Sequence, residues 1–159
     1  MCIIRPITTE DDAELAKIIR TCLESYHLNI PGTAYFDPQL DHLSRFYQEK
    51  PGRAYLVATD EAGHLLGGVG VAEFDGMASC AEMQKLYLSE AARGKGLGKK
   101  LVAQAETFAK EAGYHSLYLE THSVLQTAIH LYEKLGFQQI EKPQAVQHST
   151  MDSFYLKTF

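Results

Sequence analysis

A glycine-rich turn between a predicted strand and a predicted helix carries the pattern that points most clearly to chemistry. Gly94, Gly96 and Gly98 allow the backbone to approach a ligand closely and to turn successive N–H groups toward it. The helix that follows adds the positive end of its dipole. Four positive charges lie in and beside the turn, on Arg93, Lys95, Lys99 and Lys100. This combination predicts an anion-binding site, and a diphosphate would fit it.

Residue identity excludes two common phosphate-binding motifs. A P-loop requires Gly-Lys followed by Ser or Thr, but Gly98-Lys99 is followed by Lys100, so the hydroxyl that would hold magnesium is absent. A Rossmann turn requires G-x-G-x-x-G, and counted from Gly94 its third glycine would fall on Lys99. The turn therefore belongs to neither class.

The pattern that does match is R-x-x-G-x-G, which runs from Arg93 to Gly98 after a strand ending in Leu86-Tyr87-Leu88. A later segment reads Leu131-Tyr-Glu-Lys-Leu-Gly-Phe137. On these residues the sequence resembles the GNAT superfamily of acyl-CoA-dependent N-acyltransferases, from end to end in the order of its elements and most specifically from residue 82 to residue 137. The resemblance implies an α/β fold of the α+β type. It also implies a mixed, mostly antiparallel sheet of about six to seven strands with about four helices, in a single domain over residues 1–159.

The resemblance further implies acetyl-CoA as co-substrate and no metal. The backbone amides of residues 94–99 would hold its pyrophosphate. The pantetheine arm would lie along the end of the preceding strand, where the neighbouring strands splay apart. There the main-chain N–H of Leu86 or Leu88 would polarise the thioester carbonyl. The implied cofactor contacts are Leu86, Tyr87, Leu88, Arg93, Gly94, Lys95, Gly96, Leu97, Gly98 and Lys99.

Direct attack by an amine requires a base for the ammonium proton and an acid for the departing thiolate. In several family members the base is a strand carboxylate eleven residues before the first motif residue, which corresponds to Glu82. Glu120, which closes the next strand, is the alternative base, and His122 and His148 are weaker candidates. Tyr132 matches the usual acid, a phenol with a pKa near 10. The structural alternatives are a solvated or ion-paired Glu82 and a Tyr132 that packs in the core.

The sequence departs from the family pattern at one position. Many members carry Asn seven residues before the tyrosine, where it contacts the cofactor, and this chain has Leu125. That contact is therefore not carried over, and whether Gln126 replaces it stays open.

The elements that must position these residues follow from hydrophobic periodicity and turn signals. Thr9, with Asp12 three positions on, predicts the start of a first helix, and Asp37-Pro38 predicts the start of a short second one. Strand candidates 54–59, 65–74 and 79–88 are separated by short glycine turns, which predicts an antiparallel meander. The remaining elements are strands at 3–7, 116–121, 137–140 and 154–157 and helices from 96 to 113 and from 125 to 135.

Two loops are predicted to form the walls of the acceptor site, because variable loops on a fixed scaffold usually carry specificity. The loop at 26–36 is rich in aromatic residues, for which plain packing is an equal explanation. The loop at 143–153 is polar.

Composition restricts the class of protein. The chain has 159 residues, 45% of them apolar, and a net charge of -5, which argues against nucleic-acid binding. Its longest apolar stretch, 65–72, is too short to cross a bilayer. No signal-peptide pattern occurs at the N-terminus, and three scattered cysteines without C-x-x-C suit a reducing compartment, so a cytoplasmic location is expected.

The sequence thus predicts an N-acetyltransferase that acts on a primary amine of a small molecule or peptide, without a nucleic-acid or membrane partner. The negative charge favours a cationic acceptor, although solubility explains it equally well. An acyl-CoA-binding sensor without catalysis is the alternative, and a nucleotide-binding signalling domain is a more remote one. Oligomeric state stays open, with a homodimer among the alternatives.

Overall fold

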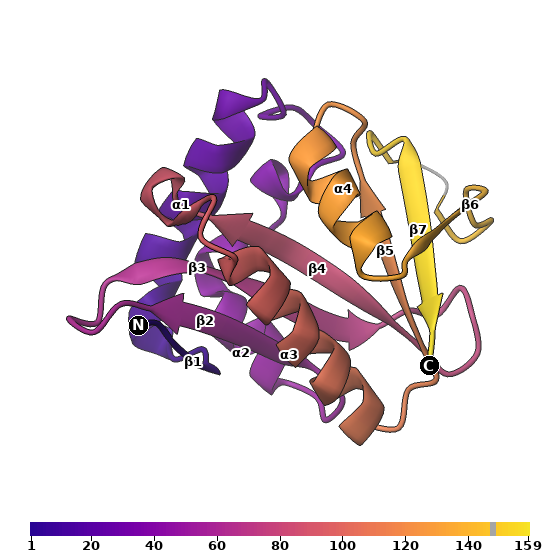
Figure 1. The fold of residues 1–159 in the computed structure, drawn as a ribbon, viewed down its shortest axis with the longest axis horizontal. Helices are drawn as coiled ribbons and strands as arrows, with labels where there is room; N and C mark the ends of the chain where they lie inside the picture. The colour runs from indigo at the N-terminus through magenta and orange to yellow at the C-terminus, as the bar shows by residue number, and fades with distance from the viewer. Residues whose placement is uncertain (147–148) are drawn as a thin grey trace.

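A computed structural model describes residues 1–146 and 149–159, and its centre is a seven-stranded sheet in the order β1-β2-β3-β4-β5-β7-β6 (Figure 1). The strands are β1 (Ile3–Pro6), β2 (Ala54–Thr59), β3 (Leu65–Glu73), β4 (Cys80–Leu88), β5 (Ser116–Thr121), β6 (Gln138–Ile140) and β7 (Ser153–Thr158). The α-helices within the described residues are α1 (Asp12–Ser25), α2 (Leu43–Gln48), α3 (Leu97–Glu111) and α4 (Gln126–Lys134). This mixed sheet with its helices confirms the predicted fold class.

The sheet changes from antiparallel to parallel pairing at its middle. β1 to β4 pair antiparallel in chain order, as the short turns predict. β4 then pairs in parallel with β5, because α3 returns the chain to the same end of the sheet. β7 lies between β5 and β6 and is antiparallel to both.

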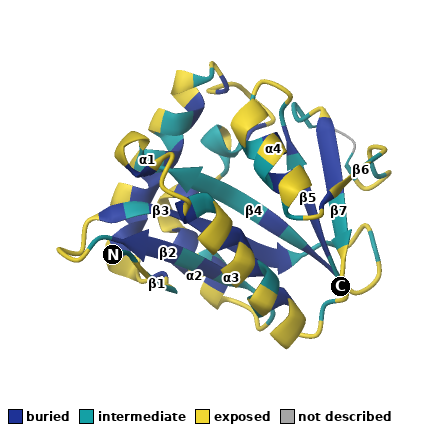
Figure 2. Cartoon of the chain, viewed as in Figure 1, coloured by how far each residue is buried: buried dark blue, intermediate teal, exposed yellow. Residues whose placement is uncertain are grey.

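The helices cover the two faces of the sheet and divide the core into two main clusters. Tyr55 and Val57 of β2 pack with residues of α1 and α2, whereas Leu56 and Ala58 pack with residues of α3 and α4. This alternation follows the two-residue period of a strand that is buried on both faces. Figure 2 shows β2 and β3 as largely buried, while α3 keeps an exposed outer face. None of the helices within the described residues has both the length and the apolar character that a bilayer span needs.

The predicted cap of the first helix is wrong by one residue. Thr8 and Asp11 form the capping box, with the Thr8 N–H donating to Asp11 Oδ2 at 2.8 Å, and a 3-10 turn at Thr9–Asp11 precedes α1. The Asp12 carboxylate is buried and accepts hydrogen bonds from the Ser44 N–H and hydroxyl at 2.9 and 2.6 Å. Thr8 and Thr9 are each followed three positions later by an aspartate, so either register is plausible from the sequence, and the contact with α2 decides between them.

The predicted second helix begins later than Asp37-Pro38 indicates. A 3-10 turn at Leu40–His42 comes first, and α2 starts at Leu43. Asp37 does not cap the start of α2; its Oδ2 lies 2.6 Å from Nζ of Lys85 on β4. A tertiary ion pair therefore takes the side chain that the local pattern assigned to a cap.

Candidate active site

The two central parallel strands separate shortly after they pair. β4 and β5 are in register only where Cys80, Ala81 and Glu82 face Ser116, Leu117 and Tyr118. β4 also carries a bulge, because Gly70 pairs with Gln84 while Gly68 pairs with Tyr87. Lys85 in the bulge has a φ of 49°, and its carbonyl accepts a hydrogen bond from the Tyr55 hydroxyl at 2.8 Å. The bulge bends β4 away from β5 and opens the sheet.

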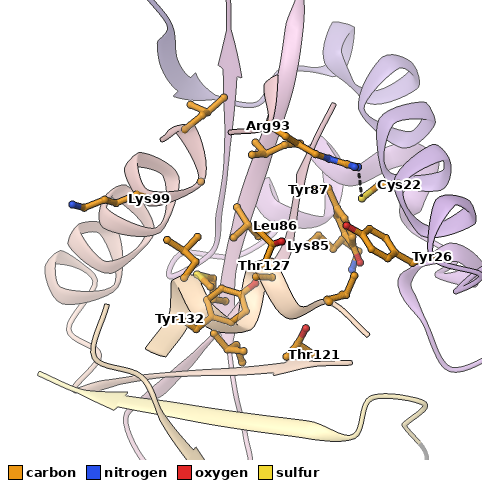
Figure 3. Close-up of a pocket in the computed structure, with 18 of the residues that line it drawn as sticks. Cys22, Tyr26, Lys85, Leu86, Tyr87, Arg93, Lys99, Thr121, Thr127 and Tyr132 are labelled. Atoms are coloured by element: carbon orange, nitrogen blue, oxygen red, sulfur yellow. Dashed lines mark hydrogen bonds between the residues drawn. The ribbon is translucent and has the colours of Figure 1, made fainter. Parts of the chain in front are cut away.

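A cavity of about 450 Å³, here called the strand-gap cavity, occupies this opening (Figure 3). It extends from the glycine turn, past the end of β4, to α4. Its lining is mostly apolar, as expected for a site that holds a long flexible ligand. The lining residues are Cys22, Tyr26, Met83, Lys85, Leu86, Tyr87, Leu88, Arg93, Gly94, Gly96, Leu97, Gly98, Lys99, Leu119, Glu120, Thr121, Leu125, Thr127, Ala128, Leu131, Tyr132 and Met151.

The glycine turn has the geometry of an anion cradle. Gly94 and Gly96 have φ angles of 75° and 77°, in the left-handed region that favours glycine, and a Cβ at either position would meet nothing within 4 Å. Among the described residues, no acceptor pairs with the first three N–H groups of α3, those of residues 97 to 99, and no side chain caps them. These open amides at a helix N-terminus fit a pyrophosphate.

The charged side chains of the turn contribute unequally. Nη2 of Arg93 lies 3.2 Å from the sulfur of Cys22 on α1 (Figure 3), which ties the turn to the opposite wall. The side chain of Lys99 extends away from the other labelled residues in Figure 3. Lys95, which the sequence also suggested, is not among the cavity-lining residues. The turn therefore offers an anion its backbone N–H groups more directly than its lysines.

Tyr132 occupies the α4 wall of the strand-gap cavity. The residue is 6% exposed, and its ring packs edge-on against Phe137 with centroids 5.9 Å apart. Its hydroxyl has no hydrogen-bond partner among the described residues, and burial raises the pKa of that hydroxyl above its ordinary value. The phenol thus combines the packing role with a free donor inside the cavity.

The two predicted carboxylates share a second cavity. This space, here called the carboxylate cavity, has a volume of about 420 Å³. Its lining residues are Gly32, Phe74, Glu82, Glu120, Ala145, Val146 and Ser149. Glu120 also lines the strand-gap cavity, so the two spaces adjoin at this residue. The loops predicted as walls meet here, because the Thr150 hydroxyl donates to the Pro31 carbonyl at 2.6 Å.

The environment of Glu82 favours a carboxyl group that titrates near neutrality. Burial raises its pKa to about 7, and the negative charge of Glu120 adds to the rise. Gln84 Nε2 donates to Glu82 Oε1 at 2.8 Å, and this bond and the charge of Lys85 work in the opposite direction. Burial also raises the pKa of Glu120, against hydrogen bonds from Tyr118 and Ser149. A group with a pKa near 7 is suited to accept a proton at neutral pH.

The first turn of α4 departs from the family pattern as the sequence indicated. Leu125 lines the strand-gap cavity, but Gln126 does not, and its amide donates to the carbonyl of Ser123. Thr127 is the polar side chain that this turn presents to the cavity, near Leu86 and Tyr132 (Figure 3).

Of the two weaker histidine candidates, one lines neither cavity and the other lies outside the described residues. His122 accepts a hydrogen bond from the Val124 N–H at 3.1 Å and lines neither cavity. His148 lies outside the described residues.

Sequence reasoning missed several lining residues. Thr127 could have been found, since it stands four residues before Leu131 on the same helical face. No local sequence pattern marks Lys85 or Cys22 as a site residue. The contacts that mark them join residues distant in sequence: Lys85 pairs with Asp37, and Cys22 contacts Arg93.

Comparison with known proteins identifies the family. A model of the acetyltransferase (GNAT) family matches residues 16–137. The uncharacterized N-acetyltransferase YjgM of Escherichia coli K12 is 42% identical over 141 residues, which cover 87% of this chain and 83% of that protein. The chain belongs to the GNAT acetyltransferase family, and the class it represents is that of acetyl-CoA-dependent acyltransferases.

Solved structures agree on the fold. A GNAT acetyltransferase from Staphylococcus aureus Mu50 superposes with a TM-score of 0.87 at 20% identity, over 99% of both chains. The PaiA N-acetyltransferase of Thermoplasma acidophilum, solved in complex with coenzyme A, superposes with a TM-score of 0.77 at 21% identity, over 100% of this chain and 99% of that one.

Proposed function

We propose that this protein transfers an acetyl group from acetyl-CoA to a primary amine of a small molecule or peptide, by direct attack with both substrates bound. The observation that carries the proposal is that the strand-gap cavity and the carboxylate cavity adjoin at Glu120. A donor bound in the first space and an acceptor bound in the second would meet between β4 and β5. Such juxtaposition supplies much of the rate gain in a two-substrate reaction.

The residues of the glycine turn fit coenzyme A. The open amides of residues 97 to 99 and the left-handed glycines would hold its pyrophosphate. The coenzyme A bound to the Thermoplasma relative supports the same ligand here. When bound, acetyl-CoA supplies a thioester whose carbonyl carbon is open to attack by an amine.

The bulge in β4 favours Leu86 over Leu88 as the donor to the thioester oxygen. Leu86 lies in the bulge, between the paired positions Gln84 and Tyr87, and has no partner in the register. It also lies near Thr127 and Tyr132 at the α4 wall of the strand-gap cavity (Figure 3). A main-chain N–H released from the ladder and facing the cavity can stabilise negative charge on an oxygen. We therefore assign this role to the N–H of Leu86.

Glu82 is the base in this proposal. Its carboxylate faces the carboxylate cavity, and a pKa of about 7 allows it to accept the proton of the acceptor ammonium, directly or through water. Glu120 then keeps two roles: it raises the pKa of Glu82 and adds negative charge where a cationic acceptor would bind.

Tyr132 completes the proposal as the donor to the departing sulfur. Its raised pKa keeps the hydroxyl protonated, so that it can donate a hydrogen bond that strengthens as charge develops on sulfur. Tyr132→Phe is expected to lower kcat roughly tenfold or more, the scale of a lost hydrogen bond to a charged group. The KM for acetyl-CoA and the melting temperature should change little, because the ring and its packing remain. Full turnover, or a loss that merely follows the melting temperature, would make Tyr132 a packing residue.

Acetyl-CoA-dependent thiol release tests the proposed function directly. A panel of polyamines, amino acids, aminoglycosides and peptide N-termini should contain acceptors that raise thiol release above the background hydrolysis of acetyl-CoA. Binding of acetyl-CoA with no acetylated product in the panel would favour a sensor. A thermal shift with ATP but not with acetyl-CoA would contradict both the acetyltransferase and the sensor.

A further inference from the structure

A partly buried chain of hydrogen bonds reaches Glu82 from α2. The Tyr47 hydroxyl, on α2, donates to Gln84 Oε1 at 2.7 Å. The Gln84 amide nitrogen in turn donates to Glu82 Oε1 at 2.8 Å. Gln84 and Glu82 stand two residues apart on β4 and so lie on the same face of the sheet.

The chain has one favourable direction. A tyrosine hydroxyl that donates to the amide oxygen leaves the amide nitrogen to face the carboxylate. The reversed amide would set two acceptor oxygens against each other. Tyr47 is 2% exposed, so water does not readily replace its hydrogen bond. Tyr47 therefore fixes the orientation of Gln84, and Gln84 fixes one oxygen of Glu82.

A glycine in β3 makes this contact possible. Gly70 pairs with Gln84 across the sheet, and a Cβ on Gly70 would lie 2.4 Å from the Tyr47 hydroxyl oxygen. Any other residue at this position would push the tyrosine off Gln84. The absence of a side chain at Gly70 thus leaves room for the Tyr47 hydroxyl beside Gln84.

We propose that Tyr47 and Gln84 are positioning residues for the base: they hold Glu82 Oε1 and leave Oε2 to take the proton of the acceptor. Among the described residues Oε2 has no hydrogen-bond partner, and Glu82 lines the carboxylate cavity. The inference rests on the proposed function, in which Glu82 is the base.

Charged and titratable groups surround Glu82 from several elements, so the effect of Gln84 must be separated from theirs. The groups are Glu120 and Tyr118 on β5, Lys85 and Cys80 on β4, Asp37 before α2, and Tyr47 on α2. Unlike these groups, Gln84 is neutral at every pH, and its hydrogen bond to Glu82 favours the carboxylate form. Removing that donor is expected to raise the pKa of Glu82 without changing any neighbouring charge.

The test is the pH dependence of kcat/KM for an acceptor found in the panel. Gln84→Met keeps the length of the side chain and removes the amide, so activity near pH 6 should fall several-fold relative to activity near pH 9, as more Glu82 becomes protonated. Tyr47→Phe should move the profile in the same direction by less. The double variant Tyr47→Phe/Gln84→Met leaves no buried hydroxyl without an acceptor, and it serves if Gln84→Met alone does not fold.

Tyr114→Phe is the matched control, since the Tyr114 hydroxyl donates to the Gly52 carbonyl at 2.9 Å and has no contact with Glu82. Its profile should match that of the wild type. If the wild type is active and folded Gln84→Met, or the folded double variant, has the same pH profile as the wild type, the inference is overturned and the proposed function stands. If the wild type acetylates no amine, the proposed function fails first and the inference fails with it.

Discussion

Glu82→Gln is expected to lower kcat by roughly 10² or more, the usual scale for the loss of a general base, while acetyl-CoA binding is preserved. The amide cannot accept the ammonium proton, but it retains the size and the polar contacts of the carboxylate. Glu82 lines the carboxylate cavity and not the strand-gap cavity, so the donor site should not change. Steady-state kinetics with calorimetry of acetyl-CoA binding separates the two effects.

Raising the pH should restore part of the lost activity in Glu82→Gln, because the acceptor amine then loses its proton without help. Glu120→Gln is the paired variant, since it removes the neighbouring carboxylate with the same change in size. If Glu120→Gln shows the large loss with recovery at high pH and Glu82→Gln does not, the base has been assigned to the wrong carboxylate.

Gly96→Asp is expected to weaken acetyl-CoA binding by well over tenfold, more than about 1.4 kcal/mol. The new side chain would fill the cradle in front of the α3 amides and place a negative charge against the phosphates. Asp is among the residues that tolerate a left-handed φ, and its Cβ would meet no protein atom within 4 Å, so the variant should fold. Calorimetry on the folded variant measures the loss.

Gly113→Asp provides the control for backbone strain. Gly113 follows the other end of α3, has a φ of 91°, and likewise offers a Cβ nothing within 4 Å. Its affinity for acetyl-CoA should remain that of the wild type. Equal affinities for all three proteins would contradict the cofactor site and, with it, the proposed function.

Local patterns predicted the parts of the fold whose signals lie within one segment. The strands 54–59 and 116–121 occur at the predicted residues, because each is a compact run rich in apolar residues. A turn also occurs where the glycines predict one, and Gly94 and Gly96 in it have the left-handed backbone that favours glycine. The start of α2 was not, because Asp37 forms an ion pair with Lys85, far along the chain.

The relation between the two carboxylates also could not be predicted. The sequence presents Glu82 and Glu120 as alternatives for one role. The parallel register sets Glu82 beside Tyr118, two residues before Glu120, and so brings both carboxylates to one cavity. That register depends on how α3 returns the chain to the sheet, which no local pattern specifies. The contact of Tyr47 with Gln84 is hidden for the same reason, because it requires α2 to pack over Gly70.

The most direct test of the account is the pH profile of kcat/KM for acetylation by the wild type, Glu82→Gln and Glu120→Gln. The acceptor should have a pKa near 10, so that its own ionisation gives a separate step. Only the carboxylate accepts a proton, so wild-type activity should rise with pH through about 7 and then follow the amine alone. Glu82→Gln should lose the step near 7, and Glu120→Gln should keep it at a lower pH because a like charge has been removed. A step that persists in Glu82→Gln and disappears in Glu120→Gln would contradict the assignment of Glu82 as the base.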